Sequence, residues 1–202
     1  INTFQVVGTV AFSTVKSNPS GCPLTTILNT FVTAAYYRIA WILLAREYGR
    51  KELASMYGFN NNVRDFVYGD DSITSINPKC AEFFNPLAIA QTLARFGLRV
   101  VSGFKDKPLT KELSPLEDCI FLACTTTIDK SRVLNTTYNP YYSRTSLSKS
   151  LAYVRVREED PLELSVQNCN DALARVFPSG RDRFDEVRKD IRQAFKQAGY
   201  TI

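Results

Sequence analysis

The feature that most constrains the fold of this chain is a pair of adjacent aspartates at a glycine turn. Asp70 and Asp71 follow Gly69, with strand-forming residues before the turn at 67–68 and after it at 73–74. Glycine and aspartate both tolerate the positive φ angles of tight hairpin turns. The stretch therefore predicts a β-hairpin whose tip presents two carboxylates, which are the hard oxygen ligands of divalent cations. The alternative is an ordinary solvated turn, because Asp and Gly are common in turns for conformational reasons alone.

Length and composition allow one sizeable domain or two small ones. The chain has 202 residues, of which 45% are hydrophobic and 22% are charged, as is usual for a globular protein. Its net charge of +5 and its pI near 9.0 are compatible with a polyanionic partner but do not establish one.

The residue types in the chain exclude several chemistries. There is no histidine, which excludes histidine-dependent acid–base and triad catalysis within this chain. The five cysteines form no C-x-x-C pair, which argues against a zinc site. Their odd number and the absence of a signal peptide favour a reducing, intracellular setting. Because the first residue is Ile1 and the first segment already has strand character, we expect a fragment or processed polyprotein product with an incomplete domain.

Two segments are predicted before the hairpin. The apolar, β-branched run Phe4–Phe12 predicts a strand. Apolar residues at helical spacing then run from Pro23 until Gly49, which predicts a long and mostly buried core helix. Its apolar length resembles a membrane span, but the polar residues Asn29, Thr30, Thr33 and Arg38 interrupt the run. Such groups are costly in hydrocarbon, so we expect no transmembrane segment.

Further elements follow the hairpin. Asn85 and the proline after it predict a helix start, and Gly97 predicts the end of that helix. Strands are predicted at Leu98–Val101 and at Cys119–Cys124, the latter pairing with Arg132–Leu134. These elements together predict an α+β fold, with helices packed on an antiparallel sheet.

Beyond Tyr141 the sequence becomes helical. Helices are predicted at Ser143–Val154, from Pro161 onward, and in a last segment that ends at Gly199. We place a domain boundary near Pro140.

Several motifs occur in a specific order. S-G-x-x-x-T-x-x-x-N spans residues 20–29, and Y-G-D-D follows at 68–71. F-G-L at 96–98 is followed by lysines, and F-L occurs at 121–122. In this series the chain resembles the RNA-dependent RNA polymerases of positive-strand picorna-like viruses, from palm motif B through motifs C, D and E into the thumb.

The resemblance implies a fold and a cellular role. The fold is a partial right-hand polymerase, with part of the palm subdomain at 1–140 and a helical thumb at 141–202. The partners are an RNA template and primer or product, ribonucleoside triphosphates, and the rest of the viral polymerase domain N-terminal to this chain. The implied place of action is the host cytoplasm, at viral replication complexes.

The resemblance also implies a two-metal nucleotidyl transfer in viral RNA genome replication. Asp70, supported by Asp71, is the expected ligand of two Mg²⁺ or Mn²⁺ ions that activate the primer 3′-hydroxyl and neutralise the triphosphate. Lys105 matches the motif D lysine that protonates or supports the departing pyrophosphate. Lys107 is close enough to compete for that role, and either lysine has a solvated surface position as its alternative.

Nucleotide selection is expected at the S-G-x-x-x-T-x-x-x-N motif. Asn29 resembles the family's ribose reader, which takes part in hydrogen bonding around the 2′-hydroxyl of the incoming nucleotide. Thr25, one helical turn away, is placed to orient it. Ser20 and Gly21 match the loop that touches the template and the nascent base pair. The structural alternatives are a partnered core amide for Asn29 and a loop or cap residue for Ser20.

Primer contacts are expected at the turn and at motif E. Four residues carry this expectation: Tyr68, Gly69, Phe121 and Leu122. The basic residue often found after the last of these is replaced here by Ala123-Cys124-Thr125, and Lys130 or Arg132 is the substitute that we infer for backbone contact. Four arginines of the thumb region have either RNA contacts or solvated helix faces as interpretations: Arg175, Arg181, Arg183 and Arg188.

The sequence departs from the family in two further places. No aspartate precedes Asp65, so the motif A aspartates that complete a two-metal clamp are absent, and Glu47 and Glu52 are poor substitutes. We therefore expect the isolated chain to be inactive. Pro23-Leu24 replaces the Ser-Gly of true picornaviruses, which indicates a relative within the picorna-like group.

Two other functions remain open on these motifs. A reverse transcriptase shares the paired-aspartate hairpin, although the Asn29 position favours RNA synthesis. A non-catalytic RNA-binding or structural palm–thumb fragment is the second alternative.

Overall fold

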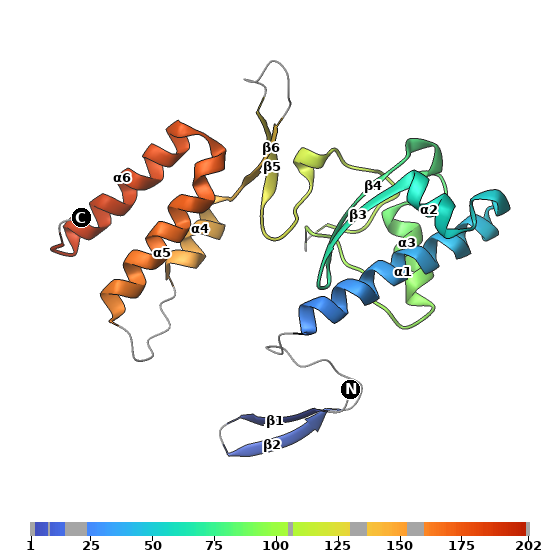
Figure 1. The fold of residues 1–202 in the computed structure, drawn as a ribbon, viewed down its shortest axis with the longest axis horizontal. Coiled ribbons are helices and arrows are strands. Elements are labelled where there is room, and N and C mark those ends of the chain that lie inside the picture. The colour runs from blue at the N-terminus through green and yellow to red at the C-terminus, as the bar shows by residue number, and fades with distance from the viewer. Residues whose placement is uncertain are drawn as a thin grey trace. The chain divides into compact units, whose positions relative to one another are not determined.

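The structure is a computed structural model that describes residues 3–7, 9–14, 24–104, 107–129, 137–152 and 160–200. It divides into two compact units, Ile1–Leu113 and Ser114–Ile202. Within the described residues the fold is mixed α+β, with small antiparallel two-stranded sheets and several helices (Figure 1). The predicted palm–thumb boundary near Pro140 concerns functional subdomains and not these compact units, and it stays a prediction.

The first unit opens with a hairpin where one strand was predicted. Strands β1 (Thr3–Val7) and β2 (Val10–Thr14) pair antiparallel, with Val7 opposite Val10. The prediction of a single strand over Phe4–Phe12 is therefore wrong, because the chain reverses after Val7. The signal overlooked in the sequence was the glycine in the middle of the apolar run, which marks a turn or bulge in a strand pattern.

Helix α1 (Thr25–Glu47) confirms the predicted long helix, and Gly49 follows its end with φ of 73°. Its predicted burial is wrong for the N-terminal half. Only four of its residues are buried, all in the C-terminal third, namely Ala40, Trp41, Leu44 and Ala45. The apolar residues lie around the whole helix rather than on one stripe, so the pattern does not indicate which side is covered. Large side chains of the N-terminal half are exposed: Ile27, Leu28, Phe31 and Val32.

By length and composition alone α1 is also apolar enough to cross a membrane. The C-terminal half of α1 nevertheless has the contacts of a core helix. Trp41 is fully buried, and Arg38 forms an ion pair with Asp65 of the neighbouring hairpin. Nothing in the described residues contradicts the expectation that the chain has no transmembrane segment.

An aromatic cluster around Trp41 forms the core of the first unit. The Trp41 ring lies 5.9 Å from Phe59 and 5.1 Å from both Phe83 and Phe84, measured between ring centroids. Its indole Nε1–H donates to the carbonyl of Leu53 at 2.7 Å, so the polar atom of this buried ring is satisfied. The short helices η1 (51–53), α2 (56–62) and η2 (78–80) bring these residues together.

The central hairpin and the helix after it form as predicted. Strands β3 (Val63–Tyr68) and β4 (Asp71–Ile76) pair antiparallel. Helix α3 (Pro86–Ala94) is capped by Asn85, whose side chain accepts a hydrogen bond from the third helical amide, as an N-cap should. The prediction of a strand at Leu98–Val101 is wrong. This segment joins no ladder within the described residues, and two of its side chains pack on the aromatic core instead.

The second unit opens with a short helix, η3 (116–118), followed by a hairpin. Strands β5 (Thr125–Asp129) and β6 (Thr137–Tyr141) pair antiparallel. The predicted strand at Cys119–Cys124 is wrong, because Phe121 bridges to Cys124 across a tight turn with two positive φ angles. The strand therefore begins only after this turn. The predicted partner at 132–134 lies outside the described residues.

All three helices predicted after Tyr141 are confirmed. They are α4 (Arg144–Ala152), α5 (Pro161–Val176) and α6 (Arg181–Gln197), with the short helix η4 (177–179) joining the last two. Helices α5 and α6 lie side by side (Figure 1) and bury one apolar face each. Together with α4 they form a core that consists of Leu147, Ala172, Val176, Val187, Ile191 and Phe195.

Candidate active site

The paired aspartates lie at the tip of the β3–β4 hairpin, as predicted. Tyr68 is opposite Asp71 in the register, so Gly69 and Asp70 form a two-residue turn. Gly69 has φ of 66°, and among the described non-glycine residues Asp70 is not one with positive φ. A positive φ at only the first turn residue is the pattern of a type II′ hairpin turn, in which glycine is favoured at that place. Both aspartates are exposed, so the turn offers two carboxylates to solvent.

The two faces of the hairpin differ in chemistry. Side chains alternate across a strand, so Asp65 and Val67 lie on the face toward α1, while Phe66 and Tyr68 lie on the opposite face and are largely exposed. Asp65 is only 12% exposed and pairs with Arg38 of α1 at 2.9 Å. It is therefore held by an arginine and is not free to join the two carboxylates at the turn.

One face of α1 holds the hairpin along its length (Figure 1). The hydroxyl of Thr33 donates to the carbonyl of Gly69 at 3.0 Å, and the amide of Gly69 donates to the hydroxyl of Thr30 at 2.8 Å. Further along, the hydroxyls of Tyr37 and Ser72 share a hydrogen bond of 2.6 Å. Positions 30, 33 and 37 lie on one helical face.

The sequence interpretation missed these contacts. Thr30 and Thr33 counted there only as interruptions of an apolar run. Their spacing, together with that of the later tyrosine, is the signal that identifies a polar stripe on an otherwise apolar helix. Such a stripe indicates that a polar segment packs against this face of the helix. It does not indicate which segment of the chain this is.

The structure describes two of the four residues predicted for nucleotide selection. Asn29 and Thr25 are half-buried in the first turns of α1, and each takes part in an interaction. Asn29 directly precedes Thr30, so the helical turn that carries it is the one that contacts Gly69. Ser20 and Gly21 lie outside the described residues.

The remaining predicted site residues are not gathered at this turn. Lys105 lies outside the described residues, and its competitor Lys107 is exposed, with its ammonium 4.8 Å from the centroid of the Phe104 ring. Phe121 and Leu122 belong to the second unit, where they form the tight turn before β5. Their roles toward a primer stay predictions.

The described residues hold only part of a metal site. They include no group of three or more His, Cys, Asp or Glu side chains arranged to hold an ion. The donor chemistry of Asp70 and Asp71 suits Mg²⁺ or Mn²⁺, but two carboxylates on one turn leave most of the coordination shell to other groups. The turn therefore fits one side of a metal site.

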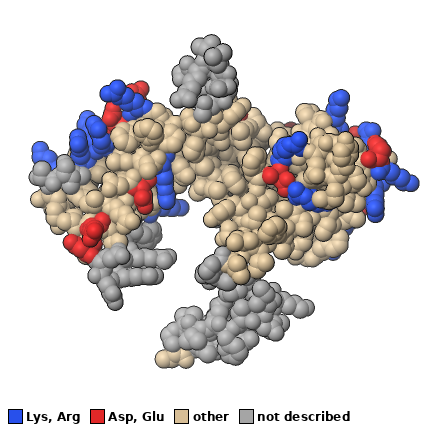
Figure 2. Space-filling model, in the orientation of Figure 1, with Lys and Arg blue, Asp and Glu red and all other residues tan. Residues whose placement is uncertain are grey.

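Three of the four arginines predicted for the thumb are paired with acidic neighbours, whereas Arg175 lies 5.9 Å from the centroid of the Tyr142 ring. On α6, Asp185 pairs with Arg181 at 3.7 Å and with Arg188 at 3.5 Å, and Glu186 pairs with Arg183 at 2.6 Å. Figure 2 shows Lys and Arg interspersed with Asp and Glu on the visible face of the molecule. Interspersed charges give a weaker field than a patch of one sign, which favours the interpretation of a solvated helix face.

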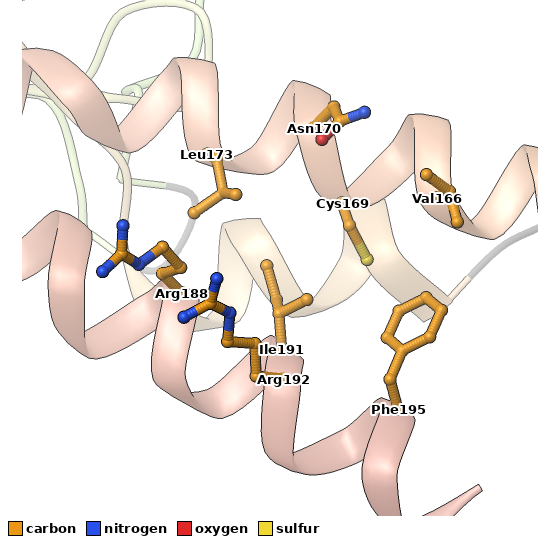
Figure 3. Close-up of a pocket in the computed structure, with 8 residues that line it drawn as sticks. All are labelled: Val166, Cys169, Asn170, Leu173, Arg188, Ile191, Arg192 and Phe195. Atoms are coloured by element: carbon orange, nitrogen blue, oxygen red, sulfur yellow. The ribbon is translucent and has the colours of Figure 1, made fainter. Parts of the chain in front are cut away.

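A separate pocket lies between α5 and α6 (Figure 3). It has a volume of about 220 Å³, and its walls are mainly apolar, with two arginines at one side. Because it contains no carboxylate, it offers nothing to a hard divalent cation. Its lining residues are Val166, Cys169, Asn170, Leu173, Arg188, Ile191, Arg192 and Phe195.

Comparison with known proteins assigns the class. The sequence model of viral RNA-dependent RNA polymerases matches residues 1–194, so the chain belongs to this family. Among individual relatives, it is 26% identical over its whole length to the RNA1 polyprotein of Satsuma dwarf virus. It is 31% identical over 191 residues, 90% of the chain, to the RNA1 polyprotein of Andean potato mottle virus. It is 28% identical over 197 residues, 95% of the chain, to the replicase polyprotein of Cricket paralysis virus.

The chain corresponds to a small part of these relatives. It spans 10% of the Satsuma dwarf virus and Cricket paralysis virus polyproteins and 25% of the Andean potato mottle virus polyprotein. These polyproteins confirm the expected relationship to picorna-like viruses.

Proposed function

We propose that this chain is the palm and thumb part of an RNA-directed RNA polymerase that replicates a viral RNA genome. The observation that carries the proposal is the exposed Asp70-Asp71 turn, anchored on the helix that bears Asn29, in a chain of the viral RNA-dependent RNA polymerase family. The replicase name of one relative supports the same activity.

The proposed reaction is the transfer of a ribonucleotide to an RNA 3′-hydroxyl. The hydroxyl oxygen bonds to the α-phosphorus, the bond from that phosphorus to the pyrophosphate oxygen breaks, and the hydroxyl proton passes to water. Asp70 holds the divalent ions, with support from Asp71. When bound, Mg²⁺ or Mn²⁺ lowers the pKa of the hydroxyl and neutralises charge on the triphosphate.

Other side chains of the chain position the reactants. Asn29 reads the ribose 2′-hydroxyl, and Thr25 orients it from one helical turn away. Lys105 donates a proton to the pyrophosphate or stabilises its charge. Exposed Tyr68 beside the turn contacts the primer.

We further propose that residues 1–202 alone are inactive. The turn supplies two carboxylates, and the described residues add no third. The missing ligands come from a palm strand with aspartates in the remainder of the polymerase, which also admits the nucleotide. The partners are this remainder, the RNA template and primer, and ribonucleoside triphosphates, at replication complexes in the host cytoplasm.

The test measures primer extension by a complete polymerase domain that contains this chain. We expect Asp70→Asn to lower the rate at least about 100-fold, because it removes a carboxylate that is proposed to hold the divalent ions at the reacting phosphate. Asp171→Asn makes the same change at an exposed position of α5, and we expect its rate to stay within about twofold of the parent rate.

Three results decide between the candidates. Undiminished extension by Asp70→Asn, with RNA binding intact, would identify a non-catalytic RNA-binding fragment instead. Preferential use of deoxynucleotides would identify a reverse transcriptase. Template-directed incorporation by residues 1–202 alone would refute the proposal that the chain is inactive.

A further inference from the structure

Both backbone polar groups of Gly69 are satisfied by side chains of one helix. Its amide donates to Thr30 Oγ1 at 2.8 Å, and its carbonyl accepts from Thr33 Oγ1 at 3.0 Å. Gly69 is buried, although its neighbours Tyr68 and Asp70 are exposed. At the tip of a hairpin such groups are usually left to water, so their capture by α1 is a specific feature of this turn.

One threonine hydroxyl accepts a hydrogen bond from Gly69, and the other donates a hydrogen bond to it. Thr30 Oγ1 donates its proton to the carbonyl of Thr26 at 2.7 Å, and a hydroxyl has one proton to give, so it meets the turn as an acceptor. Thr33 meets the turn as a donor. This pairing matches the N–H and C=O of a single residue, and a slip of the hairpin along α1 would break both bonds.

The threonine contacts are separate from those that dock the body of the hairpin. The Arg38–Asp65 ion pair and the Tyr37–Ser72 hydrogen bond lie further along α1. The hairpin therefore stays attached without the threonines, and what the threonines add is the position of its tip.

The tip contact lies next to both proposed functional side chains. Thr30 directly follows Asn29, and Gly69 directly precedes Asp70. A bond between the inner two residues sets the distance between the outer two. The distance between Asn29, proposed for nucleotide selection, and Asp70, proposed for metal binding, thus depends on one pair of hydrogen bonds.

We propose that Thr30 and Thr33 are positioning residues that hold Gly69 and so fix Asp70 relative to Asn29. This inference rests on the proposed polymerase function. Misplacement of a reacting group by about 1 Å can cost on the order of 100-fold in rate. The loss of either hydroxyl should therefore lower kcat by more than the accompanying loss of folding stability accounts for.

The experiment compares valine and serine variants in the complete polymerase domain. Thr30→Val and Thr33→Val keep the shape and remove the hydroxyl, and we expect kcat to fall by about 10- to 100-fold. We expect a higher Mg²⁺ concentration for half-maximal activity and weaker discrimination between ribo- and deoxynucleotides. Serine at either position keeps the hydroxyl and should restore kcat to within about threefold of the parent value.

A matched control removes a different bond from the same interface. Tyr37→Phe deletes the hydrogen bond to Ser72, which is further from the turn, and we expect its kcat and Mg²⁺ requirement to stay within about threefold of the parent. Equal losses of kcat in Tyr37→Phe and the valine variants would show a general effect of helix–hairpin packing and overturn the proposal.

A second measurement does not depend on catalysis. Amide hydrogen exchange at Gly69, followed by NMR with glycine-selective labelling, should become at least about tenfold faster in Thr30→Val, because the amide loses its acceptor. Unchanged exchange would refute the contact itself. Faster exchange with unchanged kcat would refute the positioning role. If Asp70→Asn also left extension intact, the proposed function would fail, while the exchange rate would still decide whether the contact exists.

Discussion

Removal of Asp65 from its ion pair with Arg38 should destabilise the chain more than removal of Glu47 from its exposed pair with Arg95. Asp65 is 12% exposed and Arg38 is 27% exposed, and their closest approach is 2.9 Å. The guanidinium also lies 4.6 Å from the centroid of the Phe59 ring and donates to the carbonyl of Ala34. Replacement of Asp65 by alanine leaves this arginine mostly buried without its counter-charge.

The expected decrease in the free energy of unfolding of Asp65→Ala lies between two known limits. Exposed ion pairs contribute about 0 to 1 kcal/mol, and removal of one partner from a fully buried pair costs about 3 to 5 kcal/mol. Partial exposure of Arg38 places Asp65→Ala between them, at about 2 to 3 kcal/mol. With a urea m-value of about 2 kcal/mol/M, the unfolding midpoint should fall by about 1 to 1.5 M.

The chain contains its own control. Glu47 and Arg95 pair at 2.6 Å, but they are 45% and 49% exposed. Glu47→Ala should therefore change the free energy of unfolding by at most about 1 kcal/mol. Urea unfolding followed by the fluorescence of Trp41 measures both variants. Equal midpoints for Asp65→Ala and Glu47→Ala would refute the assignment of a buried, structural role to Asp65.

A double variant separates the effect of the charge pair from that of its surroundings. In Arg38→Met with Asp65→Leu, both charges are replaced by apolar side chains, so no buried charge is left without a partner. We expect this double variant to be more stable than Asp65→Ala. A double variant less stable than the single one would show that the hydrogen bond to Ala34 and the contact with Phe59 matter more than the charge pair.

Three further predictions concern the core and the pocket. Gly58→Ala should destabilise the chain by about 1 to 3 kcal/mol in thermal unfolding, because its Cβ would lie 2.2 Å from the carbonyl oxygen of Leu53; Gly49→Ala, in open space but at φ of 73°, should cost about 1 to 2 kcal/mol. Trp41→Phe keeps an aromatic ring but leaves the Leu53 carbonyl without its donor, so circular dichroism should show a loss of about 1 to 3 kcal/mol. Burial raises the pKa of the Cys169 thiol above its ordinary value, so less thiolate is present at pH 7 and maleimide should label it more slowly than an unfolded control, with the rate rising further toward alkaline pH.

Much of the local structure could be predicted from short-range patterns. The β3–β4 turn followed from a glycine between strand-forming runs, the start of α3 from Asn85 and its proline, and α5 and α6 from their apolar stripes. Each of these signals lies within a few residues of the element it specifies. Where the signal was misjudged, as at Phe4–Phe12, the overlooked feature was also local.

Other features required partners that are distant in sequence. Leu98–Val101 has the composition of a strand, but a strand needs a neighbour to receive its hydrogen bonds, and this segment packs on the aromatic core instead. The burial of α1 could not be predicted either, because apolar residues surround the helix and only its end near Trp41 meets the core.

The sequence by itself determined the chemistry of the turn. Glycine permits the positive φ at position 69, and the adjacent carboxylates define the ligands that Asp70 and Asp71 can offer. Only the tertiary structure decided how that turn is held. Thr30 and Thr33 are separated from Gly69 by 39 and 36 residues, and a hydroxyl on a helix specifies no partner until packing brings one within reach. The same packing pairs Asp65, whose side chain lies on the strand face toward α1, with Arg38. Asp70 lies in the turn beyond the end of that strand and stays exposed.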